Sequence, residues 1–336
     1  MNMKKVALAL AVTVAFSGTA MAALSEKVSL TFAAQEVGTA AYNYATALQG
    51  AMIKGLPAGS TINITTTSPG GVGAPLIVNN AAKCDIVMSN SAPAKWAKEE
   101  GILGKKPTPN IACLAGGLGN DFINIMFTKK FVDKTGIKTV EELVAQKYPV
   151  KIVIKKNGTL GELSAEKVFA ALGVTFKDIE KWGGKVEKTG GDAIKSGLQD
   201  DIYDMTIDHI GAGQSNTTEL CLTHEMYDVQ MEPETMAKLV EMGYDYVTVP
   251  ANTWQGQTTD IKSVGSQQCI LVSTTMSDDV AYALTKAVCE HAKELGEAVA
   301  VLSYFKPEVA GSKTLTGVPL HPGAKKYYQE VGYAAD

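Results

Sequence analysis

Residues 28–71, VSLTFAAQEVGTAAYNYATALQGAMIKGLPAGSTINITTTSPGG, carry the pattern that decides the fold. Residues 28–33 are typical of a strand, and Gly38-Thr39 opens a helix that we expect to run to about Lys54. Residues 61–67 alternate as a strand does and end at the turn cluster Ser68-Pro69-Gly70-Gly71. The stretch therefore predicts a strand, a helix and a second strand in succession.

The same alternation continues along the whole chain. Further strands are predicted at 85–89, 111–114, 122–127, 150–154, 205–207, 247–249 and 270–272, and helices at 75–82, 140–145, 160–172, 192–198 and 278–295. Alternating units of this kind predict an α/β fold of mostly parallel sheets with helices on both faces. In such folds ligands bind at the carboxyl ends of strands, where helix N-termini present free amides. Two polar turns early in the chain and Asn157-Gly158-Thr159 later predict a cleft between two lobes that holds an anion.

The first 22 residues indicate export from the cytoplasm. Lys4 and Lys5 precede an apolar run over 6–16, and Ala20-Met21-Ala22 has the small-x-small pattern that signal peptidase cuts. The run is too short to span a bilayer, and no second long apolar stretch follows. With no Cys at the cut, we expect a periplasmic protein with no lipid anchor and no membrane insertion. ATP and nicotinamide cofactors are scarce there, so no cofactor is expected.

Composition narrows the classes of partner. Removing 22 of 336 residues leaves 314, enough for two lobes, and the net charge of −4 provides no basic stripe for nucleic acid. All 31 basic residues are lysines, so an anionic ligand must be held by Lys, hydroxyls, backbone amides or a helix N-terminus. The five cysteines allow one or two disulfides with a thiol left over, or buried free thiols.

No catalytic or metal motif is complete. His224-Glu225-Met226-Tyr227-Asp228 lacks the second His of a zinc protease, and no Cys pair has the spacing of metal ligands. Ser164 and Lys167 match S-x-x-K and Lys188-Thr189-Gly190 matches K-T-G, but the intervening S-D-N is missing. His209 follows a predicted strand and is favoured as a buried structural histidine over a cleft residue. We therefore expect no enzyme, and keep a periplasmic serine hydrolase using Ser164 and Lys167 as an alternative.

The tail provides a specific likeness. Residues 317–330, GVPLHPGAKKYYQE, resemble the end of the TAXI family, the solute receptors of TRAP transporters. YALTK at 282–286 and TVEEL at 139–143 match family segments in the correct order. The resemblance implies a type II periplasmic-binding fold, monomeric, with a two-strand hinge near 122–127 and 264–272. It places 24–122 plus 266–336 in lobe 1 and 123–265 in lobe 2. A receptor for an ABC importer remains an alternative.

The resemblance also implies a ligand and its contacts. Family members bind glutamate, glutamine or 2-oxo dicarboxylates, then dock on the membrane permease subunits of a TRAP transporter. Carried over to this sequence, the ligand-binding residues are Thr39, Tyr42, Ser68, Gly71, Ser89, Ser91, Asn157, Gly158 and Thr159. The turns Ser68-Pro-Gly-Gly71 and Asn157-Gly-Thr159 depart from the usual family pattern, which puts transfer of the ligand in doubt.

Overall fold

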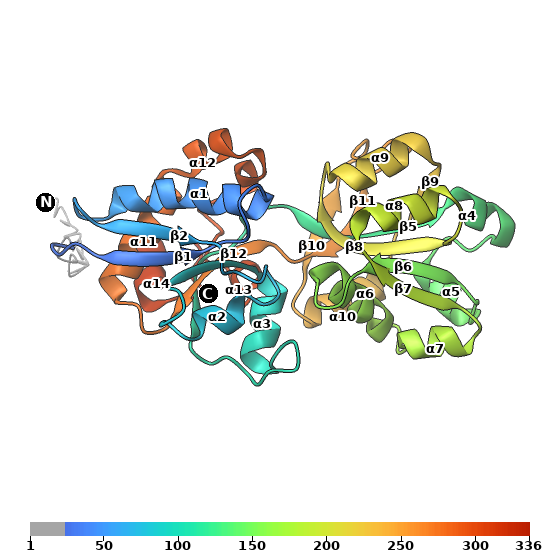
Figure 1. Ribbon diagram of the computed structural model, residues 1–336, viewed down its shortest axis with the longest axis horizontal. Helices are drawn as coiled ribbons and strands as arrows, with labels where there is room; N and C mark the ends of the chain where they lie inside the picture. Colours follow the sequence, from blue (N-terminus) through green and yellow to red (C-terminus); the bar gives the residue numbers. More distant parts are fainter. Residues whose placement is uncertain (1–23) are drawn as a thin grey trace, which may run out of the picture.

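The computed structural model describes residues 24–336, so the predicted signal segment 1–22 lies outside the described residues. Figure 1 shows two lobes side by side, each a sheet flanked by helices, with two segments of chain crossing between them. This arrangement confirms the predicted two-lobed α/β fold class. Among the described helices, none is both long and apolar enough to cross a membrane.

The first lobe is built on a five-stranded sheet in the order β2-β1-β3-β12-β4. Its strands are β1 (Ser29–Ala33), β2 (Thr61–Thr65), β3 (Ile86–Asn90), β4 (Ile111–Ala115) and β12 (Gln268–Ser273). The fourth strand in this order, β12, comes from late in the sequence and pairs antiparallel with both β3 and β4. The first lobe thus contains chain from both ends of the protein.

Helices cover both faces of this sheet. They are α1 (Ala40–Met52), α2 (Ala74–Val78), α3 (Ser91–Glu99), α11 (Asp278–Glu290), α12 (Ala292–Ala298), α13 (Lys313–Thr316) and α14 (Pro322–Val331), with short 3₁₀ turns η1 (Ile53–Gly55) and η2 (Ala300–Tyr304). The prediction of one helix over 278–295 was wrong. His291 has φ −104° and ψ 19°, outside the helical range, so the chain bends there and α12 packs against α1.

The second lobe has a sheet in the order β7-β6-β8-β5-β9 and a separate hairpin, β10-β11. The strands are β5 (Asp121–Thr128), β6 (Lys151–Lys155), β7 (Lys185–Thr189), β8 (Met205–Gly211), β9 (Met226–Asp228), β10 (Asp245–Val249) and β11 (Ile261–Gly265). The helices are α4 (Lys129–Thr135), α5 (Val140–Ala145), α6 (Leu160–Ala171), α7 (Phe176–Lys181), α8 (Gly191–Gln199), α9 (Ser215–Thr223) and α10 (Pro233–Glu241). Side chains alternate along β5, so Ile123, Ile125 and Phe127 enter the main core of the lobe together.

The sheets are less parallel than the sequence predicts. In each five-stranded sheet two strand pairs are parallel and two are antiparallel. The antiparallel pairs involve β12 in the first lobe and β5 in the second. Both strands receive the chain from the opposite lobe, so each starts at the edge where its neighbouring parallel strands end.

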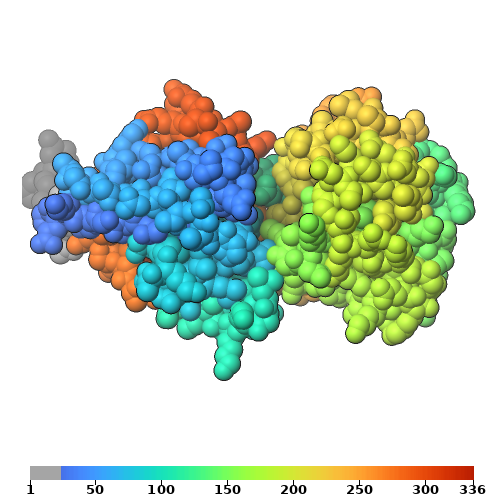
Figure 2. Space-filling view, in the orientation of Figure 1, coloured from blue at the N-terminus to red at the C-terminus, as the bar shows by residue number. Residues whose placement is uncertain are grey.

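The carboxyl ends of the parallel strands in both lobes consequently face the junction between the lobes. The space-filling view shows the lobes in contact over part of their width, the cyan part of the first against the green part of the second (Figure 2). Trp96 on α3 lies at the centre of this contact. Its ring packs, together with Ala92, Ile102 and Val72, into the hydrophobic core of the second lobe. The crossing segments themselves approach closely, since Ser263 Oγ donates to the carbonyl of Ile123 at 2.7 Å.

Candidate ligand-binding site

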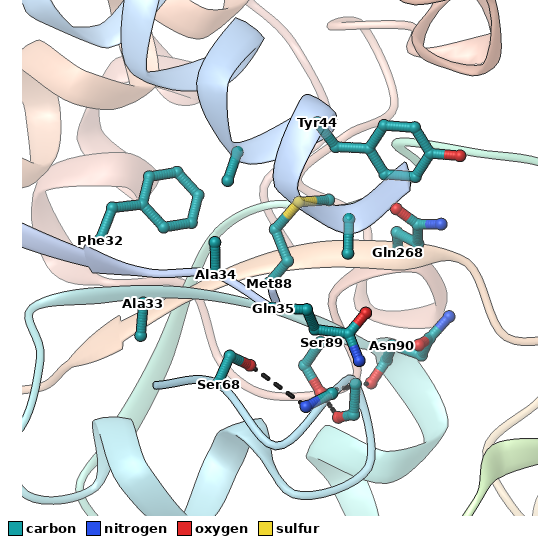
Figure 3. A pocket seen from close by; sticks show the side chains of 14 residues that line it. Phe32, Ala33, Ala34, Gln35, Tyr44, Ser68, Met88, Ser89, Asn90 and Gln268 are labelled. Atoms are coloured by element: carbon teal, nitrogen blue, oxygen red, sulfur yellow. Dashed lines mark hydrogen bonds between the residues drawn. The ribbon is translucent and has the colours of Figure 1, made fainter. Parts of the chain in front are cut away.

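A cavity of about 170 Å³ lies where β1 and β3 end, on the side of the first lobe that faces the junction. Figure 3 shows Tyr44 and Gln268 on one side of it, Met88 in the middle, and Gln35, Ser68 and Asn90 on the other side. The complete lining comprises Phe32, Ala33, Ala34, Gln35, Ala41, Tyr44, Ala45, Ser68, Gly70, Gly71, Met88, Ser89, Asn90 and Gln268. The cavity therefore combines an apolar wall with amide and hydroxyl groups and contains no lysine.

Two glycines allow the turn after β2 to close this cavity. Gly70 has a φ of 92°, in the left-handed region that disfavours other residues, and its N–H donates to Ser68 Oγ at 3.3 Å. Gly71 lies so near Asn90 that a Cβ atom there would come within 2.5 Å of Asn90 Oδ1. The buried hydroxyl of Ser89 donates to the carbonyl of Gly71 at 2.7 Å and holds the turn against β3.

Asp121, the first residue of β5, lies beside three of the lining side chains. Its Oδ2 accepts a hydrogen bond from Gln268 Nε2 at 3.2 Å, and the Asn90 amide also stabilises the carboxylate. Burial nevertheless raises the pKa of the Asp121 carboxyl above its ordinary value, against the effect of these two amides. Burial raises the pKa of the Tyr44 hydroxyl, and the negative charge of Asp121 raises it further.

Three of the predicted ligand contacts in the first lobe line the cavity: Ser68, Gly71 and Ser89. The others have different surroundings. Thr39 caps α1, where its Oγ1 accepts from the N–H of Tyr42 at 3.2 Å, and the Tyr42 side chain packs against the core of the lobe. Ser91 is buried at the crossing segment. All six stay predictions as ligand contacts.

The predicted contacts of the second lobe lie on its junction edge. Asn157, Gly158 and Thr159 form the turn between β6 and α6, and Thr159 caps the helix by accepting from the N–H of Glu162 at 3.2 Å. A Cβ atom at Gly158 would lie 3.5 Å from the side chain of Leu103. Leu103 belongs to the loop after α3, so this turn borders the first lobe.

A carboxylate of the protein itself, that of Glu162, already binds a backbone amide at the start of α6. Glu162 Oε2 accepts from the N–H of Gly158 at 3.1 Å, and Glu162 Oε1 accepts from Lys188 Nζ at 2.6 Å. Glu162 is buried, so this carboxylate is held firmly by one amide and one ammonium group. The N-terminus of α6 is therefore less open to a ligand carboxylate than the turn sequence alone suggests.

Lysines on the same edge supply the positive charge. Lys155 Nζ lies 3.3 Å from Asp208 Oδ2, and burial raises the pKa of that Asp208 carboxyl despite the neighbouring ammonium group. Lys156 follows directly and is exposed; in the described part of the chain it has no ion-pair partner. Positive charge thus lies in the second lobe, across the junction from the lysine-free cavity.

His209 fastens the second lobe to the crossing segment between β11 and β12. Its Nε2 accepts a hydrogen bond from the N–H of Ser266 at 2.9 Å, so this nitrogen must be unprotonated. Ser266 Oγ in turn accepts from the N–H of Ala92 at 2.8 Å and contacts Ser91 Oγ. Burial lowers the pKa of His209 to about 3. The histidine is structural, as the sequence favours.

Acidification should therefore weaken the fold through His209. The unfolded chain binds a proton at a pKa of about 6.5, whereas the folded chain binds it only near 3, so stability is lost as pH falls below 6.5. We expect a loss of about 2 kcal/mol between pH 6.5 and pH 5 from this residue, measured by urea unfolding. His209→Gln retains an acceptor and should show a flatter pH dependence over this range; equal slopes would contradict the assignment.

The matched family now identifies the chain. The model of the NMT1-like family matches residues 32–332, which include both lobes and the cavity. This chain belongs to the NMT1-like family. Searching curated protein sequences found no match.

Solved structures share the fold of this NMT1-like protein at low identity. A TctC solute-binding protein from Polaromonas is 15% identical, with a TM-score of 0.53 over 82% of this chain and 88% of that one. XAC2383 from Xanthomonas citri, solved with ATP bound, is 10% identical, with a TM-score of 0.51 over 91% of this chain and 96% of that one. At these identities the likeness shows the two-lobed fold of solute-binding proteins.

The hydrolase alternative loses its nucleophile in this NMT1-like fold. Ser164 is fully buried, and its Oγ is 2.9 Å from the hydroxyl of Tyr244. Lys167 Nζ lies 4.9 Å from the ring centroid of Trp96, in a cation–π contact rather than beside Ser164 as a base. The five cysteines are all buried and unpaired, which selects the free-thiol alternative.

Several site residues are absent from the sequence-based prediction. Gln35, Tyr44, Asn90 and Gln268 line the cavity, and Asp121 lies beside Gln268 and Asn90. One signal could have identified Asp121: it is the acidic first residue of the mostly apolar strand 121–127, one residue after the glycine-rich stretch 116–119.

Proposed function

We propose that this chain is a periplasmic solute receptor that closes its lobes over a small organic anion or amino acid and delivers it to a TRAP membrane permease. Glutamate, glutamine and 2-oxo dicarboxylates form the proposed ligand class. The single observation that carries the proposal is the partly polar cavity at the ends of β1 and β3, facing the second lobe. The resemblance of the tail to the TAXI family supports the transporter class, and the predicted signal segment supports the periplasm.

The size of the cavity agrees with a small solute. A cavity of roughly 150 Å³ accommodates benzene, and this one measures about 170 Å³. The first lobe can therefore hold one end of a molecule the size of an amino acid. The edge of the second lobe, with Lys155, Lys156 and the turn at 157–159, would enclose the other end on closure.

We further propose that the lobes move as two units, 24–122 with 266–336 and 123–265. Closure would be accommodated in the two crossing segments, at 116–120 and 265–267. Because the closed state alone contacts the ligand from both sides, ligand binding would shift the population toward it. The closed receptor is then the form that docks on the permease.

Native mass spectrometry tests this proposal directly. The mature protein should carry a small solute, with the mass of an amino acid or a 2-oxo dicarboxylate, that disappears after unfolding and refolding, and adding the same solute should raise the melting temperature. Saturable binding of the identified solute by isothermal titration would establish a receptor. A mass without excess, together with no thermal shift from glutamate, glutamine or 2-oxoglutarate, would contradict the proposed ligand class.

Gly71→Ala should abolish most of this binding without unfolding the protein. The added Cβ atom would fall 2.5 Å from Asn90 Oδ1, so either the turn or the Asn90 side chain must move into the cavity. We expect affinity for the identified solute to fall at least about tenfold, or about 1.4 kcal/mol. Gly50→Ala is the matched control: it adds the same methyl group on α1, where no atom lies within 4 Å. Unchanged affinity in Gly71→Ala would show that the ligand does not bind in this cavity.

A further inference from the structure

We infer that the ligand of this site carries a protonated amine and that Asp121 is the carboxylate that binds it. The inference rests on the proposed receptor function and makes its ligand class narrower. It selects amino acids such as glutamate and glutamine over the 2-oxo dicarboxylates, which have no ammonium group.

The position of Asp121 gives the first argument. Its carboxylate contacts Gln268 and Asn90, and its charge acts on Tyr44, and all three residues line the cavity. Asp121 also opens β5, the strand by which the chain enters the second lobe. A group bound to this carboxylate would therefore lie beside Gln268 and Asn90 at the border of the cavity, and next to a crossing segment.

The missing counter-ion gives the second argument. Other partly buried carboxylates near the junction each have a lysine: Glu162 has Lys188 at 2.6 Å and Asp208 has Lys155 at 3.3 Å. Asp121 forms no ion pair with any residue that the structure describes. Buried charges in proteins are normally paired or neutralised. Asp121 interacts only with neutral amide groups, so the ammonium group of a ligand could act as its counter-ion.

Neighbouring acceptors suit an ammonium group, which donates three hydrogen bonds. Gln267 is 6% exposed, and its Oε1 has no hydrogen-bond partner among the described residues. Its Nε2 donates to the carbonyl oxygen of Asp121 at 3.2 Å, which places this side chain next to the same residue. The amide of Asn90 donates to the carbonyl of Ser266 at 2.8 Å, and its Oδ1 lies beside Gly71.

The distribution of charge across the junction gives the third argument. The cavity in the first lobe is lined by no lysine and borders a carboxylate, so it complements a positive group. On the edge of the second lobe Lys155 is paired with Asp208, whereas the adjacent Lys156 is exposed and has no ion-pair partner among the described residues, so this edge complements a negative group. A zwitterion with its ammonium group at Asp121 and its carboxylate toward these lysines matches both signs. An amine-free dianion would place like charges together at Asp121.

A comparison of matched ligands tests the inference. After ligand has been stripped by unfolding and refolding, the protein is titrated with the common L-amino acids and with their 2-oxo acid counterparts. We expect one or more amino acids to bind, with the matching 2-oxo acid at least about thirtyfold weaker. Asp121→Asn keeps the shape and an acceptor for Gln268 but loses the charge, and should weaken the amino acid about thirtyfold or more. Asp279→Asn removes an exposed carboxylate on α11 as the control.

A measurement on the unaltered protein guards against misfolding of the variant. Amino-acid affinity should fall as pH falls through the raised pKa of Asp121, because protonation removes the charge that holds the ammonium group. Without ligand, Asp121→Asn should be at least as stable as the parent at pH 7, since it removes an unpaired, partly buried charge.

The outcomes separate the two levels of proposal. A 2-oxo acid that binds as tightly as its amino acid, with Asp121→Asn unchanged, overturns the role of Asp121 and leaves a receptor for organic anions. A co-purified solute without an amine would likewise overturn the role of Asp121 and leave the receptor function in place. The absence of saturable binding in either set, with no co-purified solute, contradicts the receptor function itself.

Discussion

Trp96→Ala should lower the free energy of unfolding by about 3–5 kcal/mol, the range for removing a large buried aromatic side chain. Trp96 is 5% exposed, and its Nε1 donates to the carbonyl of Met242 in the second lobe at 2.6 Å. Its ring packs edge-on against Tyr244 with centroids 5.7 Å apart, and Lys167 lies over its face. Because these contacts join the lobes, we expect the parent to unfold in one urea transition and Trp96→Ala to unfold in two.

Two conservative variants isolate the role of the hydrogen bond. Trp96→Phe keeps a ring but removes the indole N–H, and should cost about 1–2 kcal/mol because the partly buried Met242 carbonyl loses its donor. Trp254→Phe makes the same change at a residue 3% exposed whose Nε1 has no partner in the part of the chain that the structure describes. It should cost clearly less. A Trp96→Ala protein that unfolds within 1 kcal/mol of the parent would show that α3 does not couple the lobes.

Gly265→Ala should destabilise the protein by about 3 kcal/mol, at the upper end of what overpacking costs. A Cβ atom on Gly265 would lie 2.0 Å from the carbonyl oxygen of Asp121 and 3.1 Å from the Cα atom of Phe122. These are backbone atoms of β5, which cannot turn aside as a flexible side chain can. The two crossing strands must then separate, which moves Asp121 as well.

Urea unfolding measures this loss, with Gly50→Ala again as the control for an added methyl group. The control should be neutral or stabilising by about 0.5–1 kcal/mol, since alanine is the better residue inside a helix. Small-angle scattering of Gly265→Ala should in addition differ from that of the parent, because the crossing sets how the lobes are held. A variant as stable as the parent would mean that the strands separate without cost.

Most strands and about half of the α-helices could be predicted because their periodicity is local. The strand–helix–strand unit in residues 28–71 appears as β1, α1 and β2, with ends within a few residues of the prediction. The strand β7 had no such signal: its sequence KVEKT is charged, and none of its five side chains is fully buried. The bend at His291 was missed because apolar residues on both sides keep a helical spacing through it.

Only the part of the site that lies in sequence-recognisable turns could be predicted. The turn at 68–71 combines a strand end with glycines, so Ser68 and Gly71 could be placed at the cavity from sequence. Gln268 and Asp121 are 147 residues apart and meet only because β12 returns to the first sheet while β5 enters the second. The role of Glu162 as an internal anion was equally hidden, because the same Thr-x-x-Glu spacing is an ordinary helix-capping signal.

The position of β12 between β3 and β4 in the first sheet sets the order in which an emerging chain can complete its folding. Residues 121–265 contain every strand of the second sheet and the β10-β11 hairpin, so that part can assemble from continuous chain. β4 gains its partner only when residues 268–273 arrive between it and β3. Gln268, which lines the cavity, belongs to that late strand. A chain cut short before it would possess a finished second lobe and an unfinished pocket.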